Sequence, residues 1–239
     1  MENKYFNYQE FSAEQQMEVS EAFPVLMRKV YVWMAFALAI TGLTAYYVAT
    51  NETLLTAILT NKVLFFGLII AELALVMSVS AAINKLSLTV ATLLFILYSV
   101  INGATMSIIF LLYEASSIAT VFFITAGTFG AMATIGYTTK KDLSSIGRIL
   151  VMALIGLVIA TVVNLFFKSP GMTMVLSYIG VIVFVGLTAW DSQKIKLMLM
   201  QAPDVDEAAQ KVALRGALTL YLDFVNLFLY LLRIFGKRR

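Results

Sequence analysis

Three of the 14 acidic residues stand in or beside long apolar stretches, and their chemistry is the most informative in the chain. Glu72 and Asp223 lie near the middle of such stretches, and Asp191 lies at the edge of one. A charge at the centre of a membrane helix costs about 2.5–3.5 kcal/mol on insertion scales, so a carboxylate there usually serves a function. The alternative is a structural role, as a neutral carboxyl or a polar contact between helices.

The composition leaves proton chemistry to few side-chain types. The chain has 239 residues and contains no Cys and no His. Disulfides, thiol nucleophiles and thiolate metal sites are therefore excluded, as are imidazole ligands and Ser-His triads. Carboxylates, Lys and Tyr remain, and we expect no bound cofactor.

The stretches between charged residues are long enough to cross a membrane as helices. The chain is 61% hydrophobic and 13% charged, whereas a soluble domain carries about 25% charged residues. The apolar stretches exceed the 9–11 residues of a barrel strand, which predicts an all-α membrane protein with seven transmembrane helices. A cytosolic enzyme and a secreted disulfide scaffold are excluded, and the net charge of +3 gives no reason to expect nucleic acid. The predicted spans are 30–50, 63–84, 86–113, 115–139, 149–167, 169–190 and 212–232.

These spans divide the chain into three parts. Residues 1–29 are predicted to be a polar tail, residues 30–235 the membrane domain, and residues 236–239 a basic tail. Most Lys and Arg residues near the span ends fall on the side of the amino terminus. The positive-inside rule therefore predicts a cytoplasmic amino terminus and a carboxyl terminus on the other side of the membrane.

The last two helices are predicted to form an antiparallel pair. Residues 192–200 contain no Gly or Pro, so the sixth helix is expected to continue past its apolar stretch. Pro203 marks the turn, and Asp204 is the expected cap of the seventh helix, with Glu207 three residues on. Positions 191 and 223 are then equidistant from a turn centred on residue 207, and Asp191 and Asp223 are expected to meet.

A polar stripe runs along the seventh helix. At 100° per residue its members fall within about 80° of one another. Such a stripe is expected to face the bundle interior or an aqueous path rather than lipid. Glu72 differs, because its helical neighbours are apolar and its partner must come from another helix. The stripe consists of Arg215, Thr219, Asp223, Asn226, Tyr230 and Arg233.

Two carboxylates in contact cannot both ionise easily, and they titrate as one unit. At low pH a shared proton would bridge Asp191 and Asp223. At higher pH repulsion would part the helices, or a cation would enter. Hard cations such as Ca²⁺ prefer oxygen ligands. The pair is therefore a candidate proton-sensitive gate, a candidate transient Ca²⁺ site, or both, with Glu72 as a weaker candidate ligand.

Three segments resemble the Bax inhibitor-1 family in its bacterial branch. They are GYTTKKDLS at 136–144, GLTAWDSQKIK at 186–196 and LYLDFVNLFL at 220–229. Together with the segments around residues 72 and 102–113, the resemblance covers nearly all of residues 24–236.

The resemblance implies a fold of seven helices with the last surrounded by the other six. It also implies that Asp191 and Asp223 form a pH-sensing pair, and that the protein shares the family's association with pH-dependent calcium leak and protection against cell death. Bacterial relatives are linked to modulation of a membrane-bound protease. The expected location is the cell inner membrane, or an intracellular membrane in a eukaryote. Some members latch the aspartates with an Arg near the end of the second helix. Lys85 stands there in this chain and lacks the bidentate fork of Arg.

We therefore expect a calcium leak channel in the lipid bilayer, responsive to protons and Ca²⁺, and not an enzyme. The ion path is expected to involve Glu72, Asn226 and Tyr230 together with Arg215 and Thr219. One alternative is a membrane interaction protein that modulates a membrane-bound protease or a cell-death partner. The others are a proton-coupled transporter and an intramembrane aspartyl protease. The protease alternative lacks the Gly-x-Gly-Asp and Pro-Ala-Leu motifs of that class.

Overall fold

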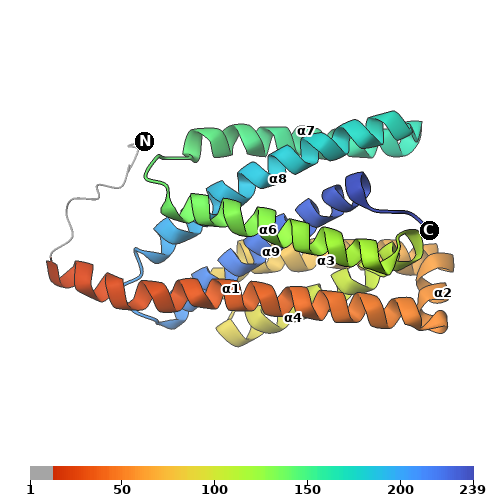
Figure 1. Ribbon diagram of the computed structural model, residues 1–239. Coiled ribbons are helices and arrows are strands. Elements are labelled where there is room, and N and C mark those ends of the chain that lie inside the picture. The colour runs from red at the N-terminus through yellow and green to blue at the C-terminus, as the bar shows by residue number, and fades with distance from the viewer. Residues whose placement is uncertain (1–12) are drawn as a thin grey trace.

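The structure is a computed structural model that describes residues 13–239, and its regular elements over that range are helices (Figure 1). One isolated antiparallel bridge joins Tyr113 and Arg238. The elements in chain order are α1 (Ala13–Thr50), α2 (Glu52–Thr60), α3 (Lys62–Ala82), the 3-10 helix η1 (Ile83–Lys85), α4 (Leu88–Met106), α5 (Ile109–Leu112), α6 (Ala115–Thr138), α7 (Ser144–Phe167), α8 (Pro170–Leu199) and α9 (Glu207–Phe235).

Seven helical segments of the described chain are long and apolar enough to cross a membrane, and each overlaps one predicted span. This confirms the predicted all-α class with seven membrane helices. The third segment is interrupted after Met106, where a short turn separates α4 from α5. The segments are Glu21–Thr50, Lys62–Lys85, Leu88–Leu112, Ala115–Thr138, Ser144–Phe167, Pro170–Leu199 and Glu207–Phe235.

The last helix, α9, is the most buried of the seven. Of its most apolar stretch 56% is buried inside the protein, against 6% for α3 and for α7. Helices α1, α4, α6 and α8 pack directly against α9, while α3 packs on α4 and α7 packs on α8. Helix α9 carries Asp223 and Asn226 in mid-span, and polar side chains within a membrane helix face other helices rather than lipid. The central position implied for the last helix is therefore present, with four helices in direct contact and two outside them.

The first membrane helix begins before the predicted boundary at residue 30. Helix α1 continues without a break through that position, and its membrane-spanning part starts at Glu21. Leu26 and Val30 are fully buried, because they recur at helical spacing on the face that packs against the bundle. Residues 1–12 of the predicted polar tail lie outside the described residues.

The basic tail at 236–239 docks on the turn before α6. The Lys237 ammonium lies 2.9 Å from the Glu114 carboxylate, and the Glu114 amide donates to the Lys237 carbonyl at 3.0 Å. The Lys237 amide donates to Ser117 Oγ at 2.9 Å, and the Arg239 amide donates to the Leu112 carbonyl at 3.1 Å. These contacts tie the end of α9 to the α5–α6 turn.

The turn between α8 and α9 lies at residues 200–206, where Pro203 predicts it, but its cap is a different aspartate. Asp206 Oδ1 accepts a hydrogen bond from the Ala209 amide at 2.7 Å. Asp204 instead accepts from the amide of Val205 at 2.6 Å. The predicted cap was therefore wrong by two residues, because the cap must directly precede the first helical residue.

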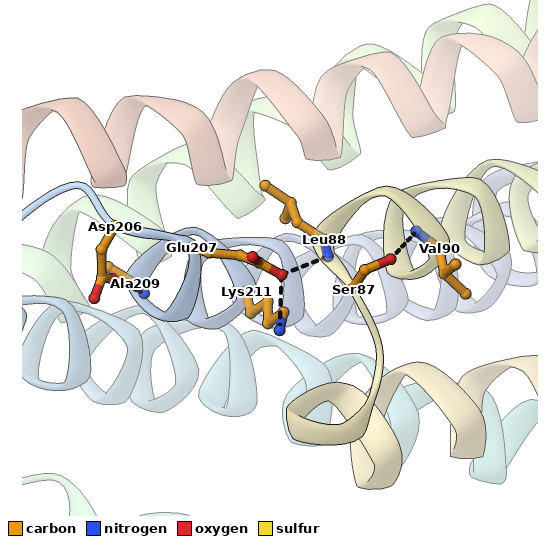
Figure 2. Close-up of polar contacts among 7 residues, drawn as sticks. All are labelled: Ser87, Leu88, Val90, Asp206, Glu207, Ala209 and Lys211. Atoms are coloured by element: carbon orange, nitrogen blue, oxygen red, sulfur yellow. Dashed lines mark hydrogen bonds and ion pairs between the residues drawn. The ribbon is translucent and has the colours of Figure 1, made fainter.

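Glu207 also has a role that its spacing does not predict. Its carboxylate accepts from the Leu88 amide at 3.1 Å and lies 2.9 Å from the Lys211 ammonium. Figure 2 shows this bridge from the start of α9 to the start of α4, beside the Ser87 cap on Val90. The Leu88 amide at a helix start has no partner within its own helix. Glu207 therefore joins two helix ends rather than completing a capping box.

Candidate functional site

The two predicted aspartates lie together in the interior. Asp191 on α8 is 8% exposed, and Asp223 on α9 is 5% exposed. Asp191 is close enough for its charge to act on Asp223. Asp223 Oδ2 is buried and has no hydrogen-bond partner among the described residues. Because buried polar atoms are nearly always hydrogen-bonded, this oxygen marks the pair as a site where a proton or a cation can bind.

Positive charge near the pair is limited. Among residues 13–239 no Lys or Arg forms an ion pair with Asp191 or Asp223. The charge of Lys194 reaches Asp191, but the Lys194 side chain is exposed and its ammonium lies 4.9 Å from the centre of the Trp190 ring. A buried charge without a paired counter-charge is strongly disfavoured. The surroundings thus favour a pair that holds a proton or exchanges it for a cation.

Close packing on α6 and α7 fixes the position of Asp191. Ser192 Oγ donates to the Ala133 carbonyl at 2.8 Å in a buried contact. Gly136 on α6 lies directly against the Ala189 carbonyl, and Gly147 on α7 lies against the Trp190 ring, so neither glycine has room for a Cβ. The residues flanking Asp191 are therefore held by neighbouring backbone, which sequence reasoning missed.

Two of the sequence motifs meet at the end of α6. The buried Gln193 accepts from the Leu143 amide at 2.9 Å and donates to the Lys141 carbonyl at 2.8 Å. Lys196 donates to the Tyr137 carbonyl at 2.8 Å. The segment that follows Asp191 thereby holds the loop between α6 and α7.

The loop also contains an exposed carboxylate that binds its own backbone. Asp142 accepts a hydrogen bond from the Ser144 amide at 2.8 Å, at the start of α7. The hydrogen bonds that the Ser144 side chain and amide donate to it hold the pKa of Asp142 below its ordinary value. Asp142 therefore has a structural role outside the membrane-spanning helices and is no part of the buried pair.

Replacing Gln193 with Leu is expected to loosen this loop. The Leu143 amide and the Lys141 carbonyl would lose their partner, at about 1 kcal/mol for each bond. We expect trypsin to cleave after the exposed Lys140 and Lys141 at least about fivefold faster, because local opening becomes more frequent. Mass spectrometry of timed digests measures this. Gln201→Leu, at an exposed position in the α8–α9 turn, is the matched control. Equal cleavage of the two variants would contradict the role of Gln193.

Glu72 has its partners on α4, as the apolar surroundings on its own helix required. Thr105 Oγ1 donates to Glu72 Oε1 at 2.6 Å, and Asn102 Nδ2 makes a longer contact with Oε2 at 3.5 Å. Asn102 in turn accepts from the Tyr221 hydroxyl of α9 at 3.0 Å, and that hydroxyl bonds to Thr41 Oγ1 at 2.7 Å. Glu72 therefore belongs to a polar network between α1, α3, α4 and α9.

This network is separate from the aspartate pair. No group of three acidic side chains that could hold a metal ion occurs in the part of the chain that the structure describes. Glu72 is on α3, which packs on α4 rather than on α8 or α9. Glu72 consequently does not join Asp191 and Asp223 as a third ligand.

The predicted stripe on α9 reaches the interior only in part. Asp223 is buried, whereas Arg215 and Arg233 are exposed, so of these three residues only Asp223 lies in the bundle interior. Arg215 and Arg233 lie nearer the ends of α9, where a long cationic side chain can leave the hydrocarbon. The Arg233 guanidinium lies 5.3 Å from the centre of the Tyr230 ring.

The remaining members of the stripe make local contacts. Thr219 donates to the Arg215 carbonyl at 3.1 Å, and Asn226 Nδ2 donates to the Leu222 carbonyl at 2.8 Å. Tyr230 stacks on Phe184 of α8 with ring centres 5.8 Å apart. Thr219 and Asn226 therefore bind the backbone of α9 itself, and Tyr230 packs on the neighbouring helix α8.

The candidate latch residue lies away from the aspartates. Lys85 ends η1 and is exposed. Over residues 13–239 its ammonium forms no ion pair with either aspartate. The structure therefore holds the aspartate pair without a basic latch from the second membrane helix.

The fold and site together define a multi-pass membrane protein with a buried pair of carboxyl groups on its last two helices. A family model described as inhibitor of apoptosis-promoting Bax1 matches residues 24–239. The chain therefore belongs to the Bax inhibitor-1 family, which confirms the resemblance seen in its motifs.

Several bacterial proteins are similar to this chain over most of their length. "Inner membrane protein YbhL" of Escherichia coli (strain K12) is 54% identical over 214 residues, which cover 89% of this chain and 92% of the relative. An uncharacterized protein of Borreliella burgdorferi is 44% identical over 213 residues, with coverage of 89% and 92%. Another from Deinococcus radiodurans is 41% identical over 212 residues, with coverage of 89% and 90%.

Proposed function

We propose that this protein is a pH-sensitive calcium leak channel gated by Asp191 and Asp223. The observation that carries the proposal is the buried Asp223 Oδ2 without a hydrogen bond, beside a second buried carboxyl group. The Escherichia coli relative is named as an inner membrane protein. We propose the same membrane for this chain, with its amino terminus in the cytoplasm.

The pair would work through the contact between α8 and α9. When the two carboxyl groups share one proton, a hydrogen bond would join them and α8 and α9 would stay in contact. Without that proton, two like charges face one another away from water, and repulsion favours separation of the helices. Deprotonation is thus the event that would open the contact.

A passing Ca²⁺ ion would replace the proton as the positive charge between the carboxylates. Resident calcium sites use six to eight oxygen ligands, whereas this pair offers only two carboxyl groups. Binding there would be brief. Brief binding suits permeation, which needs an ion to enter and also to leave.

The purified chain in liposomes loaded with a calcium-sensitive dye tests this proposal. We expect calcium entry that rises from acidic to neutral pH and exceeds entry into protein-free liposomes. Entry equal to that of protein-free liposomes at every pH would overturn the leak, and would leave a membrane interaction protein as the better proposal. Calcium entry that requires a proton gradient in the opposite direction would point instead to a proton-coupled transporter.

A further inference from the structure

A second feature of the membrane domain, away from the aspartate pair, is an apolar cavity on the side of α9. Its volume is about 100 Å³, and it is lined by side chains of α1, α4, α5, α6 and α9. For scale, an apolar cavity of ~150 Å³ stays dry and binds a benzene-sized ligand. The cavity therefore has room for a short length of hydrocarbon.

The floor of the cavity belongs to the central helix. Phe224, Val225 and Phe228 of α9 line it and are only 4–6% exposed. On the α6 wall, Phe122 is 39% exposed. Its ring centre lies 5.4 Å from that of Phe224 and 6.3 Å from that of Phe228. Buried aromatic rings on the floor and a partly exposed ring at the wall describe a cavity that opens at the protein surface.

The opening lies between α1 and α6. Both helices pack on α9. They meet one another toward the start of α1 and the end of α6, where the Phe23 and Tyr137 rings stack with centres 6.0 Å apart. On the α1 wall, Gly42 is exposed, and a Cβ built on it meets nothing within 4 Å. The missing side chain at Gly42 keeps this entrance wide.

Three helices place the cavity at the same depth. Gly42 is eight residues from the end of α1, Phe122 is seven residues from the start of α6, and Phe228 is seven residues from the end of α9. At 1.5 Å per residue, each lies about 10–12 Å inside the helix ends. The hydrocarbon core of a bilayer is ~30 Å thick. The entrance therefore faces acyl chains rather than headgroups or water.

The residues that line the cavity suit an apolar occupant such as a lipid acyl chain. Thr41 is the only lining residue with a polar side chain. Its hydroxyl already contacts the Tyr221 hydroxyl at 2.7 Å and the Ser99 carbonyl at 3.0 Å. The lining contains no charged residue that would hold a headgroup. An empty apolar space at this depth forfeits dispersion contacts that a lipid chain can supply.

We propose that this cavity is a binding site for one acyl chain of a membrane phospholipid, inserted sideways between α1 and α6. The chain would lie on Phe224, Val225 and Phe228. The site is independent of the proposed calcium leak, and its test measures contact with lipid rather than ion flux.

Photo-crosslinking of the full chain in phospholipid vesicles tests the site. One phospholipid carries a diazirine in the middle of its acyl chain, and a matched one carries it on the headgroup. Mass spectrometry then locates the cross-links. We expect the acyl-chain probe to label Phe224, Val225 and Phe228, and the headgroup probe to leave them unlabelled. Absence of acyl-chain labelling on these three residues, or equal labelling by the headgroup probe, would overturn the proposal.

A second test of the site uses the Gly42→Leu variant, in which the leucine side chain fills the entrance of the cavity. We expect loss of labelling on the three α9 residues, with unchanged labelling of Phe166 and Phe167, which are 83% and 75% exposed on α7. Gly127→Leu is the control, because a Cβ at Gly127 on α6 also meets nothing within 4 Å and Gly127 does not line the cavity. If Gly42→Leu also loses the α7 labelling, the smaller Gly42→Ala takes its place and should lower the α9 labelling in part. Persistent labelling of α9 in a Gly42 variant that retains the α7 labelling would contradict the site.

Discussion

Liposomes that contain the Asp223→Asn variant are expected to leak calcium at a rate that no longer changes with pH. The asparagine amide has nearly the shape of the carboxyl group but cannot lose a proton in this range. Its N–H₂ group can donate to Asp191 at any pH. The variant should therefore keep the closed contact that the wild-type protein has only when the two aspartates share a proton.

We expect the variant to lose the entire change in calcium leak that the wild-type protein shows between acidic and neutral pH. The leak of Asp223→Asn at neutral pH should fall to the level that the wild-type protein shows at acidic pH. Asp191→Asn should act in the same direction, because either asparagine can donate to the remaining aspartate. The two changes together should add little to either one, since residues that act as a unit are not additive.

The control for this prediction is Asp204→Asn. Asp204 is an exposed aspartate in the turn before α9. Within the part of the chain that the structure describes, its side chain forms a hydrogen bond only with the amide of Val205. An asparagine can accept the same bond, so the leak should keep its pH response. Calcium-dye measurements across acidic and neutral pH compare the wild-type protein, the two single variants, the double variant and the control. A normal pH response in Asp223→Asn would remove the pair from the mechanism. Cleavage of an added membrane peptide that both asparagine variants lose would favour an intramembrane aspartyl protease instead.

The second large effect is expected at Gly136, where Gly136→Ala should destabilise the protein. A Cβ there would run into the Ala189 carbonyl of α8. A backbone atom cannot move aside by rotating, so α6 and α8 must separate. Overpacking of this kind costs about 1–3 kcal/mol, and the buried bond from Ser192 to Ala133 would be strained as well. We expect a lower melting temperature of the purified protein in detergent.

Gly130→Ala is the matched control for this change on the same helix. A Cβ at Gly130 meets nothing within 4 Å. Alanine is favoured over glycine in a helix interior by about 1 kcal/mol, so the control should melt at the same temperature or higher. The two substitutions are chemically identical, and only Gly136→Ala should lower the melting temperature. A Gly136→Ala protein as stable as the control would show that α6 and α8 do not pack as closely as described.

The site was predictable from the sequence where short-range rules apply. Asp191 and Asp223 flank one turn, so an antiparallel helix pair brings them together without reference to the rest of the chain. The partners of Glu72 were not predictable, because Thr105 and Asn102 are on another helix. The same holds for Gln193, whose partners lie about 50 residues away. Such contacts depend on which faces of the helices meet.

By itself, the sequence determined that this is a membrane protein with seven helices. It also determined that Asp191 and Asp223, whose burial costs free energy, lie on the last two helices. Those conclusions follow from charge, length and the cost of burying a carboxylate, which are properties of local segments. Only the tertiary structure decided that α9 is enclosed by four helices, that Asp206 rather than Asp204 caps it, and that Arg215 and Arg233 face outward. It also decided that Glu72 lies apart from the aspartate pair. Packing between helices sets these features, because hydrophobicity alone does not select which side of a membrane helix meets protein and which meets lipid.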